Sequence, residues 1–135
     1  MSDWNQQVID EFRANDGTVT TMGFGRSLVL LHHRGARSGT VRVSPLASVR
    51  TDAGWLVAAS KAGAPDNPDW FHNLLAHPDV ALEAPGEGTV RVRARVLSGQ
   101  ERDAAWERFT AMSDGFRGYQ ERTERVIPVV ELARR

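Results

Sequence analysis

Residues 90–96 read VRVRARV, and this strict alternation of apolar and charged side chains constrains the fold more than any other segment. Successive side chains of a strand point to opposite faces, so the pattern predicts a strand with one buried and one solvated face. Such strands belong to antiparallel sheets, because the strands of parallel sheets are buried on both faces. The expected core is therefore an antiparallel sheet.

Five further segments have the composition of strands. They span residues 27–33, 41–50, 55–60, 80–84 and 126–132. Glycine-containing turns at 35–39, 52–54 and 85–88 connect strands directly, which is typical of a meander. Pro45 has no backbone N–H group, so it predicts an edge or a bulge in the second of these strands.

A first helix is predicted near the N-terminus, where Trp4, Val8 and Phe12 recur at helical spacing after a cap at Ser2 or Asp3. Its apolar face has two readings. We favour packing on the sheet, because the helix also carries acidic residues. Weak association with a membrane surface is the alternative.

Two more helices follow in the sequence. Asn67 as N-cap and Pro68 in the first helical position begin the second, which ends before Pro78. The third spans residues 98–109, and two glycines interrupt the short aromatic stretch after it, residues 113–119. The chain has too few helices for a doubly wound sheet, so we expect one mainly β (α+β) domain over residues 1–135, a small antiparallel barrel.

Composition excludes several classes of function. Basic and acidic residues number 17 each, so the net charge of zero gives no reason to expect a nucleic acid partner. The absence of cysteine excludes disulfides and thiolate sites. No apolar run reaches the roughly 18–20 residues that span a bilayer, and the polar N-terminus is unlike a secretory signal. A cytoplasmic protein is expected.

Familiar catalytic motifs are missing from the sequence. It contains no phosphate-binding loop of nucleoside triphosphatases, no dinucleotide fingerprint and no nucleophile elbow. His32 and His33 are adjacent on a strand and point to opposite faces, while His72 and His77 have no acidic ligand at metal spacing. No metal site is expected.

Residues 34–42, RGARSGTVR, form a basic turn. Guanidinium groups and the free N–H groups of a glycine turn suit a phosphate or carboxylate ligand. The alternative is a solvated turn between two strands.

A second candidate site begins at the end of the predicted strand 55–60. The small residues of segment 58–60 allow a planar ligand to approach the backbone. Lys61, the only lysine, and the helix start near Asn67 favour an anion. The alternative is a plain strand–loop–helix connection. Four aromatic residues are candidate walls for a flat ring, or else core: Trp70, Phe71, Phe116 and Tyr119.

These blocks together resemble the deazaflavin (coenzyme F420)-dependent nitroreductase family, actinobacterial oxidoreductases of the flavin/deazaflavin split-barrel superfamily. The resemblance covers nearly the whole chain, through segments 12–15, 35–39, 42–46, 58–61, 67–70, 77–78, 119–120 and 127–130 and through Thr123. It implies an FMN-binding split-barrel-like antiparallel β-barrel with helices packed on one side. It also implies a reductase that passes a hydride from F420H2 to a quinone or nitro-aromatic acceptor.

The resemblance also implies where the coenzyme binds. Its contacts map to Ala36, Arg37, Ser38, Arg42, Val43, Ser44, Pro45, Leu46, Ala47, Ala58, Ala59, Ser60, Lys61, Asp69, Trp70, Phe71, His72, Asn73 and Phe116. Arg37, Ser38, Arg42 and Lys61 would hold the phosphate and acidic tail, and the backbone of segments 44–47 and 58–60 would cradle the ring.

Ser60 and Tyr119 are the candidate catalytic residues, which would polarise or protonate the acceptor. Related nitroreductases line the acceptor side with several tyrosines, whereas here only Tyr119 remains, beside Ser113 and Phe116. Loss of hydroxyl groups changes acceptor choice, so a quinone is preferred to a nitro-aromatic compound.

Three other readings stay open. One is a related barrel that uses FMN, which lacks the long acidic tail and needs fewer basic residues. Another is a non-catalytic carrier of the coenzyme or of a small lipophile. A nucleic-acid module is disfavoured, because the arginines of residues 90–96 have no interleaved aromatics. Split barrels often pair, so a homodimer is a candidate assembly.

Overall fold

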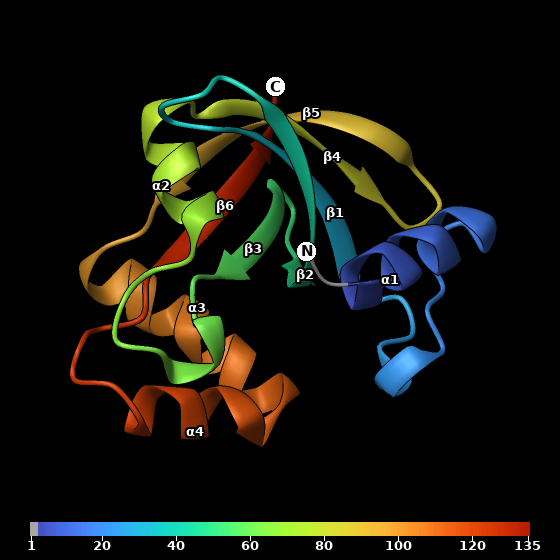
Figure 1. The fold of residues 1–135 in the computed structure, drawn as a ribbon. Coiled ribbons are helices and arrows are strands. Elements are labelled where there is room, and N and C mark those ends of the chain that lie inside the picture. Colours follow the sequence, from blue (N-terminus) through green and yellow to red (C-terminus); the bar gives the residue numbers. More distant parts are fainter. Residues whose placement is uncertain (1–2) are drawn as a thin grey trace.

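The computed structural model describes residues 3–135, apart from the side chains of residues 3, 4, 22 and 62. The expected cap at Ser2 or Asp3 and the apolar contact of Trp4 lie outside this description. Figure 1 shows a curved sheet with helices at its periphery.

Six antiparallel strands close into a barrel in the order β1-β2-β3-β6-β5-β4. They are β1 (Leu28–Arg34), β2 (Val41–Arg50), β3 (Gly54–Ala58), β4 (Asp79–Ala84), β5 (Gly88–Val96) and β6 (Val129–Arg134). Short turns join the pairs β1–β2, β2–β3 and β4–β5, whereas longer stretches of chain separate the partners in β1–β4, β3–β6 and β5–β6. The expected antiparallel barrel is confirmed.

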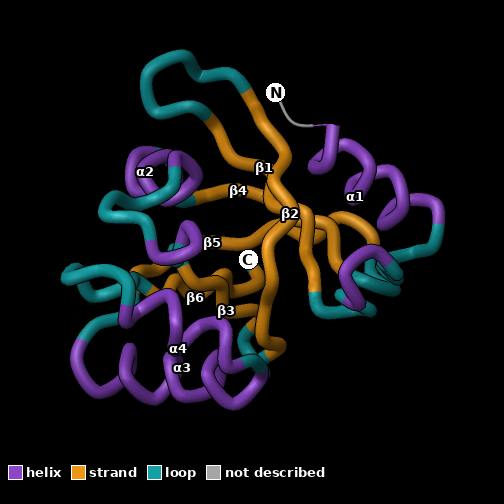
Figure 2. Tube along the Cα trace, turned by 60° about the horizontal axis from the view of Figure 1, so that its bottom comes forward, coloured by secondary structure: helices purple, strands orange, loops and turns teal. Residues whose placement is uncertain are grey.

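The helices lie around the barrel rather than inside it (Figures 1 and 2). They are α1 (Asp3–Ala14), α2 (Asp69–Ala76), α3 (Gly99–Met112) and α4 (Asp114–Glu121), with short 3-10 segments η1 (Thr21–Gly23) and η2 (Lys61–Gly63). Helix α1 packs near β2, α2 near β1, and α3 near β3 and β6. Helices α3 and α4 lie together at the end of the barrel where η2 is found.

Strand β5 has the two faces that its alternation predicts. Arg91, Arg93 and Arg95 are exposed, Val92 is fully buried, and Val90 packs against the main core. Val96 departs from the pattern because it is 40% exposed at the end of the strand. The alternation therefore identified the strand, and the barrel interior selected its inner face.

The first helix uses its apolar face against the barrel. Val8, Ile9 and Phe12 are buried in a cluster with Leu28 and Leu30 of β1. This is the packing that we favoured over membrane contact. A bidentate pair between Arg13 and Glu83 of β4 also holds the helix, with Nη2 2.8 Å from Oε2 and Nε 3.1 Å from Oε1.

Strands β2 and β3 pair over only part of their lengths, and this opens the barrel. Their register joins Ser48 to Val57 and Arg50 to Trp55, so β2 before Ser48 pairs with β1 alone. Pro45 lies in this one-sided part of β2, where its missing N–H group costs no bond to β3. The β1–β2 register runs through Pro45 unbroken, so the proline marks an edge and not a bulge.

Two local expectations were wrong. The last strand begins at Val129 instead of residue 126, because Pro128 has no N–H group and the backbone of Ile127 bonds to side chains of Arg102 and Gln120. Asn67 does not cap α2. Pro68 occupies the N-cap and Asn67 Oδ1 accepts a bond from Arg125 instead.

The glycine-interrupted aromatic stretch forms a separate helix, α4. Ser113 is extended and ends α3, and its Oγ accepts the N–H group of Gly115 at 3.2 Å to cap α4. A capped start and packing on η2 outweigh the low helix propensity of Gly115 and Gly118.

Candidate functional site

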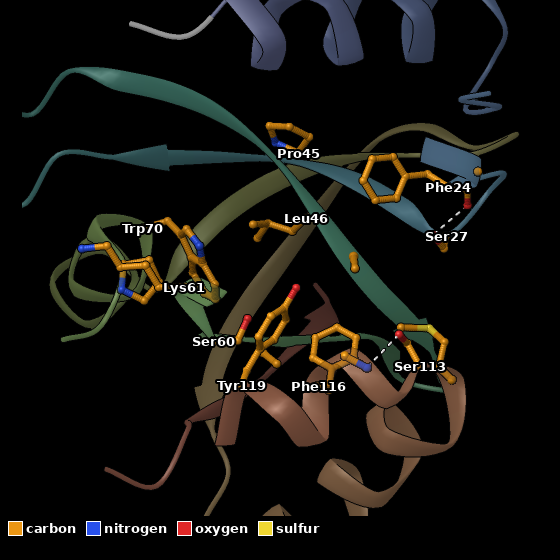
Figure 3. A pocket seen from close by; sticks show the side chains of 16 residues that line it. Phe24, Ser27, Pro45, Leu46, Ser60, Lys61, Trp70, Ser113, Phe116 and Tyr119 are labelled. Atoms are coloured by element: carbon orange, nitrogen blue, oxygen red, sulfur yellow. Dashed lines mark hydrogen bonds between the residues drawn. The ribbon is translucent and has the colours of Figure 1, made fainter. Parts of the chain in front are cut away.

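A cleft of about 640 Å³ opens where β2 and β3 separate. We call it the β2–β3 cleft. It is lined by Gly23, Phe24, Ser27, Pro45, Leu46, Ala47, Ala58, Ser60, Lys61, Pro68, Trp70, Met112, Ser113, Gly115, Phe116 and Tyr119. Figure 3 shows β2 crossing above it, Trp70 and Lys61 on one side, and Tyr119 and Phe116 rising from α4 below.

Two smaller hollows continue from this cleft. The middle hollow, of about 550 Å³, is lined by Gln6, Ile9, Arg13, His33, Arg42, Val43, Ser44, Asp69 and Trp70. The basic hollow, of about 390 Å³, is lined by Gly35, Ala36, Arg37, Ser38, Arg42, Asp69, His72 and Asn73. Trp70 is common to the cleft and the middle hollow, and Arg42 and Asp69 are common to the two smaller hollows. The three hollows therefore adjoin one another through these shared residues, and we call them together the path.

The basic hollow is formed by the turn between β1 and β2 and the first turn of α2. Arg37 and Arg42 are exposed there and supply positive charge, while Asp69 is a single opposing carboxylate. The N–H group of Ala36 bonds to Asn73 Oδ1, and that of Thr40 bonds to Ser38 Oγ. The turn is tight because a Cβ on Gly35 would lie 2.4 Å from Ser38 Oγ. This arrangement suits a phosphate or carboxylate better than a neutral group.

A buried chain of hydrogen bonds links the basic hollow to the middle hollow. Asn73 Oδ1 accepts the Ala36 N–H group at 2.9 Å, and Asn73 Nδ2 lies 2.9 Å from His33 Nδ1. His33 Nε2 is in turn 2.8 Å from Ser44 Oγ. Burial, reinforced by the nearby charge of Arg42, lowers the pKa of His33 below its ordinary value of 6.5. His33 is therefore neutral at pH 7.

Aromatic side chains give the floor of the β2–β3 cleft a fixed shape. The ring of Phe116 meets those of Trp106, Phe109 and Tyr119 edge to face, with centroids 6.1, 5.1 and 5.8 Å away. Tyr119 and Ser60 both line the cleft and both carry a hydroxyl group (Figure 3). The cleft therefore has an aromatic floor and two hydroxyl-bearing side chains in its lining.

Lys61 lies at the mouth of the cleft and not in the basic hollow. Its Nζ pairs with Asp66 Oδ2 at 3.1 Å, and its backbone has φ of +46°, a left-handed conformation that is uncommon outside glycine. The structure thus separates Lys61 from Arg37, Ser38 and Arg42, with which the resemblance had grouped it.

The expected coenzyme contacts fall almost entirely on this path. Ala59 and Phe71 are the exceptions, because both side chains are buried in the main core and line none of the three hollows. The side chains of Ala59 and Phe71 pack in the core of the barrel and do not contact a ligand on this path. Their chain neighbours Ala58, Ser60, Trp70 and His72 line the path instead.

Sequence reasoning missed His33, which we had considered only as a metal ligand. It also missed Phe24 and Ser27, which form the wall opposite Tyr119 (Figure 3). Side chains alternate between the two faces of a strand, and this alternation places His33 on the inner face of β1. That position was the signal in the sequence from which the role of His33 could have been predicted. No pattern near Phe24 indicated a wall, because η1 reaches the cleft only through the tertiary fold.

The chain matches the family model described as F420H(2)-dependent quinone reductase over residues 4–133. This protein belongs to the F420H2-dependent quinone reductase family. The match confirms the resemblance read from the sequence and the expected coenzyme F420, and it identifies an oxidoreductase family.

Curated relatives agree with the family. An F420H(2)-dependent quinone reductase of Mycobacterium tuberculosis is 37% identical over 110 residues, which cover 79% of this chain and 73% of the relative. A second protein of that organism, named for the same activity, is 38% identical over 104 residues, or 77% of this chain and 87% of the relative.

Solved structures share the barrel. A structure described as F420-H2 dependent reductase (FDR-A) superposes with a TM-score of 0.72 at 34% identity, covering 79% of this chain and 94% of its own. A structure described as a domain-swapped dimer gives 0.74 at 32% identity, covering 96% and 97%. The heme storage protein HutZ of Vibrio cholerae, with 0.59 at 17% identity over 94% and 87%, shares the fold alone.

Two features are absent from the described residues. No helix there is long and apolar enough to cross a bilayer. No group of three or more histidine, aspartate or glutamate side chains is placed to hold a metal ion within that part of the chain.

Proposed function

We propose that this protein transfers a hydride from reduced F420 to a quinone. In the proposal the deazaflavin ring occupies the β2–β3 cleft and the phosphate and acidic tail extend to the basic hollow. The adjacency of the three hollows carries the proposal, since it places an apolar, aromatic-floored cleft and an arginine-lined end along the same path. A flat ring with a long anionic tail has that distribution of chemistry.

Arg37 and Arg42 would bind the anionic end. Arg42 lines both smaller hollows, so one guanidinium can serve the phosphate and the start of the tail. Ser44, oriented by His33, adds a hydroxyl group in the middle hollow. FMN has a phosphate but lacks the long acidic tail, so it would need fewer of the basic residues of this hollow.

Small residues allow the ring to lie against the backbone. Ala47 of β2 and Ala58 of β3 face each other across the separation of the strands, and Leu46 and Trp70 add apolar surface. When bound, the reduced coenzyme supplies the hydride, which carries both electrons. The protein orients the ring and the acceptor and excludes water between them.

Tyr119 and Ser60 would donate hydrogen bonds to the acceptor. Reduction of a quinone places negative charge on its carbonyl oxygens, and a hydroxyl donor aimed at such an oxygen stabilises it and can pass a proton. A quinone needs one such contact at each carbonyl, whereas a nitro group presents two oxygens on one nitrogen. With a single tyrosine in the described floor of the cleft, a nitro-aromatic acceptor is the second candidate.

We extend the proposal to a single functional domain over residues 1–135 that assembles as a homodimer. A relative of similar fold, described as a domain-swapped dimer, supports pairing. Sedimentation of the purified protein at several concentrations tests it, and a monomer at all concentrations would contradict it.

The activity is tested by mixing the protein with reduced F420 and menadione and following the return of the oxidised coenzyme's visible absorbance. We expect enzyme-dependent reoxidation that Arg37→Ala with Arg42→Ala reduces mainly through a higher KM for the coenzyme. The matched control is Arg91→Ala with Arg93→Ala on the outer face of β5, which removes equal charge far from the path. Absence of turnover and binding, or a yellow protein carrying FMN, would contradict the proposal.

A further inference from the structure

Arg125, in the segment between α4 and β6, binds the outer side of the loop that follows β3. Its Nη1 donates to Ala59 O at 3.1 Å, its Nη2 to Ser60 O at 2.9 Å and its Nε to Ala64 O at 3.0 Å. Nη1 also donates to Asn67 Oδ1 at 2.6 Å. One guanidinium group thus holds the loop through four neutral acceptors.

Planarity of the peptide group then decides where the N–H groups of this loop point. In a trans peptide the carbonyl and the following N–H group point in opposite directions. With Ala59 O and Ser60 O turned to Arg125, the N–H groups of Ser60 and Lys61 point away from it. Neither donates a hydrogen bond among the described residues. Ser60 and Lys61 line the β2–β3 cleft and Arg125 does not.

The loop and the arginine are both held firmly in place. A Cβ on Gly63 would lie 2.7 Å from the carbonyl oxygen of Tyr119, so the loop packs directly on α4. Gln120 Nε2 donates to the carbonyl of Arg125 at 2.7 Å, which anchors the arginine from the same helix. Such a contact would not reorganise when a ligand enters.

We propose that Arg125 is a positioning residue that presents the N–H groups of Ser60 and Lys61 to a pyrimidine carbonyl of the deazaflavin ring. The inference rests on the proposed function for the identity of the ring. The guanidinium charge lies at the carbonyl ends of two peptide dipoles, so it strengthens their N–H groups as donors. Partial burial lowers the pKa of Arg125, offset in part by Asp66, and the group stays cationic.

The first test needs no coenzyme. Amide signals of Ser60 and Lys61 in ¹⁵N–¹H NMR spectra should be single and sharp in the native protein and shifted or broadened in Arg125→Ala. Arg125→Lys, which keeps the charge but cannot bond three carbonyls in one plane, should give an intermediate result. The matched control is Arg135→Ala, which removes bonds to Val92 O and Val80 O elsewhere on the barrel. Unchanged signals in both Arg125 variants would overturn the positioning role, whether or not F420 binds.

The second test measures the pKa of the bound coenzyme's 8-hydroxyl group. The 8-hydroxyl of oxidised deazaflavin is conjugated with its pyrimidine carbonyls, so its ionisation moves negative charge onto their oxygens. Two aligned N–H groups favour that anion, and Arg125→Ala should raise the pKa of the bound 8-hydroxyl by about one unit, read by absorbance against pH. Arg135→Ala should leave it unchanged. Binding with an unaltered pKa in Arg125→Ala would overturn the inference while leaving the proposed function intact, and failure of the native protein to bind would overturn the proposed function.

Discussion

Asn73 donates from Nδ2 to Nδ1 of His33 across 2.9 Å, and this bond decides which nitrogen of the imidazole carries the proton. The amide is oriented because its Oδ1 accepts the Ala36 N–H group, which can only donate. Nδ1 of His33 is therefore an acceptor, and Nε2–H donates to Ser44 Oγ. The Ser44 hydroxyl keeps its own proton for a ligand in the middle hollow.

The substitution Asn73→Asp should reverse the pKa shift of His33. A carboxylate can still accept from Ala36, but it places a negative charge where Nδ2 now donates, which favours the imidazolium. We expect the pKa of His33 to move from below 6.5 to above it. NMR titration of the histidine ring protons measures this directly. Asn15→Asp, at an exposed position, is the control, and an unchanged His33 titration in Asn73→Asp would contradict the assigned tautomer.

Acid should loosen the attachment of α1 before the barrel unfolds. Hydrogen bonds from Thr20 and Thr21 lower the pKa of Glu11 from 4.5 to about 2, and the Arg13 guanidinium lowers that of Glu83. A carboxyl group with a lowered pKa contributes stability that is complete above its ordinary value and is lost as pH falls toward the folded value. The loss should therefore occur between pH 4.5 and about 2.

Hydrogen exchange of the α1 amides as a function of pH measures this loss. In Glu11→Gln the protection of α1 should be lower at neutral pH and should change less through the acid range. Equal acid sensitivity of the variant and the native protein would show that other groups attach the helix.

Two glycines of the cleft region should respond oppositely to alanine. Gly63 has φ of +82° and no room beside Tyr119, so Gly63→Ala should destabilise the protein by about 1–3 kcal/mol and raise the KM for the acceptor as α4 is displaced. A Cβ at Gly118 would have no neighbour within 4 Å, and the residue lies inside α4, so Gly118→Ala should stabilise by roughly 0.5–1 kcal/mol. Urea unfolding compares them, and equal effects would contradict the contact between the loop and α4.

Removal of the two cleft hydroxyl groups tests their role with the acceptor. If Tyr119 donates to the reduced oxygen, Tyr119→Phe should lower kcat with menadione by roughly 10²-fold; if Ser60 donates, Ser60→Ala should do so. In either case the KM for the coenzyme should change little. Thr110→Val is the control, because its hydroxyl bonds to Glu107 O on α3. If kcat is unchanged in both cleft variants, the proton comes from another source.

Much of the barrel was predictable because strand signals act over a few residues. The alternation in residues 90–96 indicated β5, the hairpin glycine indicated the β2–β3 turn, and Pro78 marked the end of α2. The same local reasoning failed for residues 126–128 and for Asn67. Ile127 is bound by the side chains of Arg102 and Gln120, and Asn67 is bound by Arg125. The tertiary fold brings these groups together, and local pattern does not show it.

The sequence by itself therefore determined the antiparallel barrel, the family and most of the residues along the path, since these follow from local pattern and ordered motifs. Only the tertiary structure decided that Lys61 and the basic turn belong to different hollows, and that Ala59 and Phe71 serve the core. It also decided the role of Arg125, which bonds to Ala59 across 66 residues of sequence. A hydrogen bond depends on proximity in space, and barrel closure brings such distant groups together.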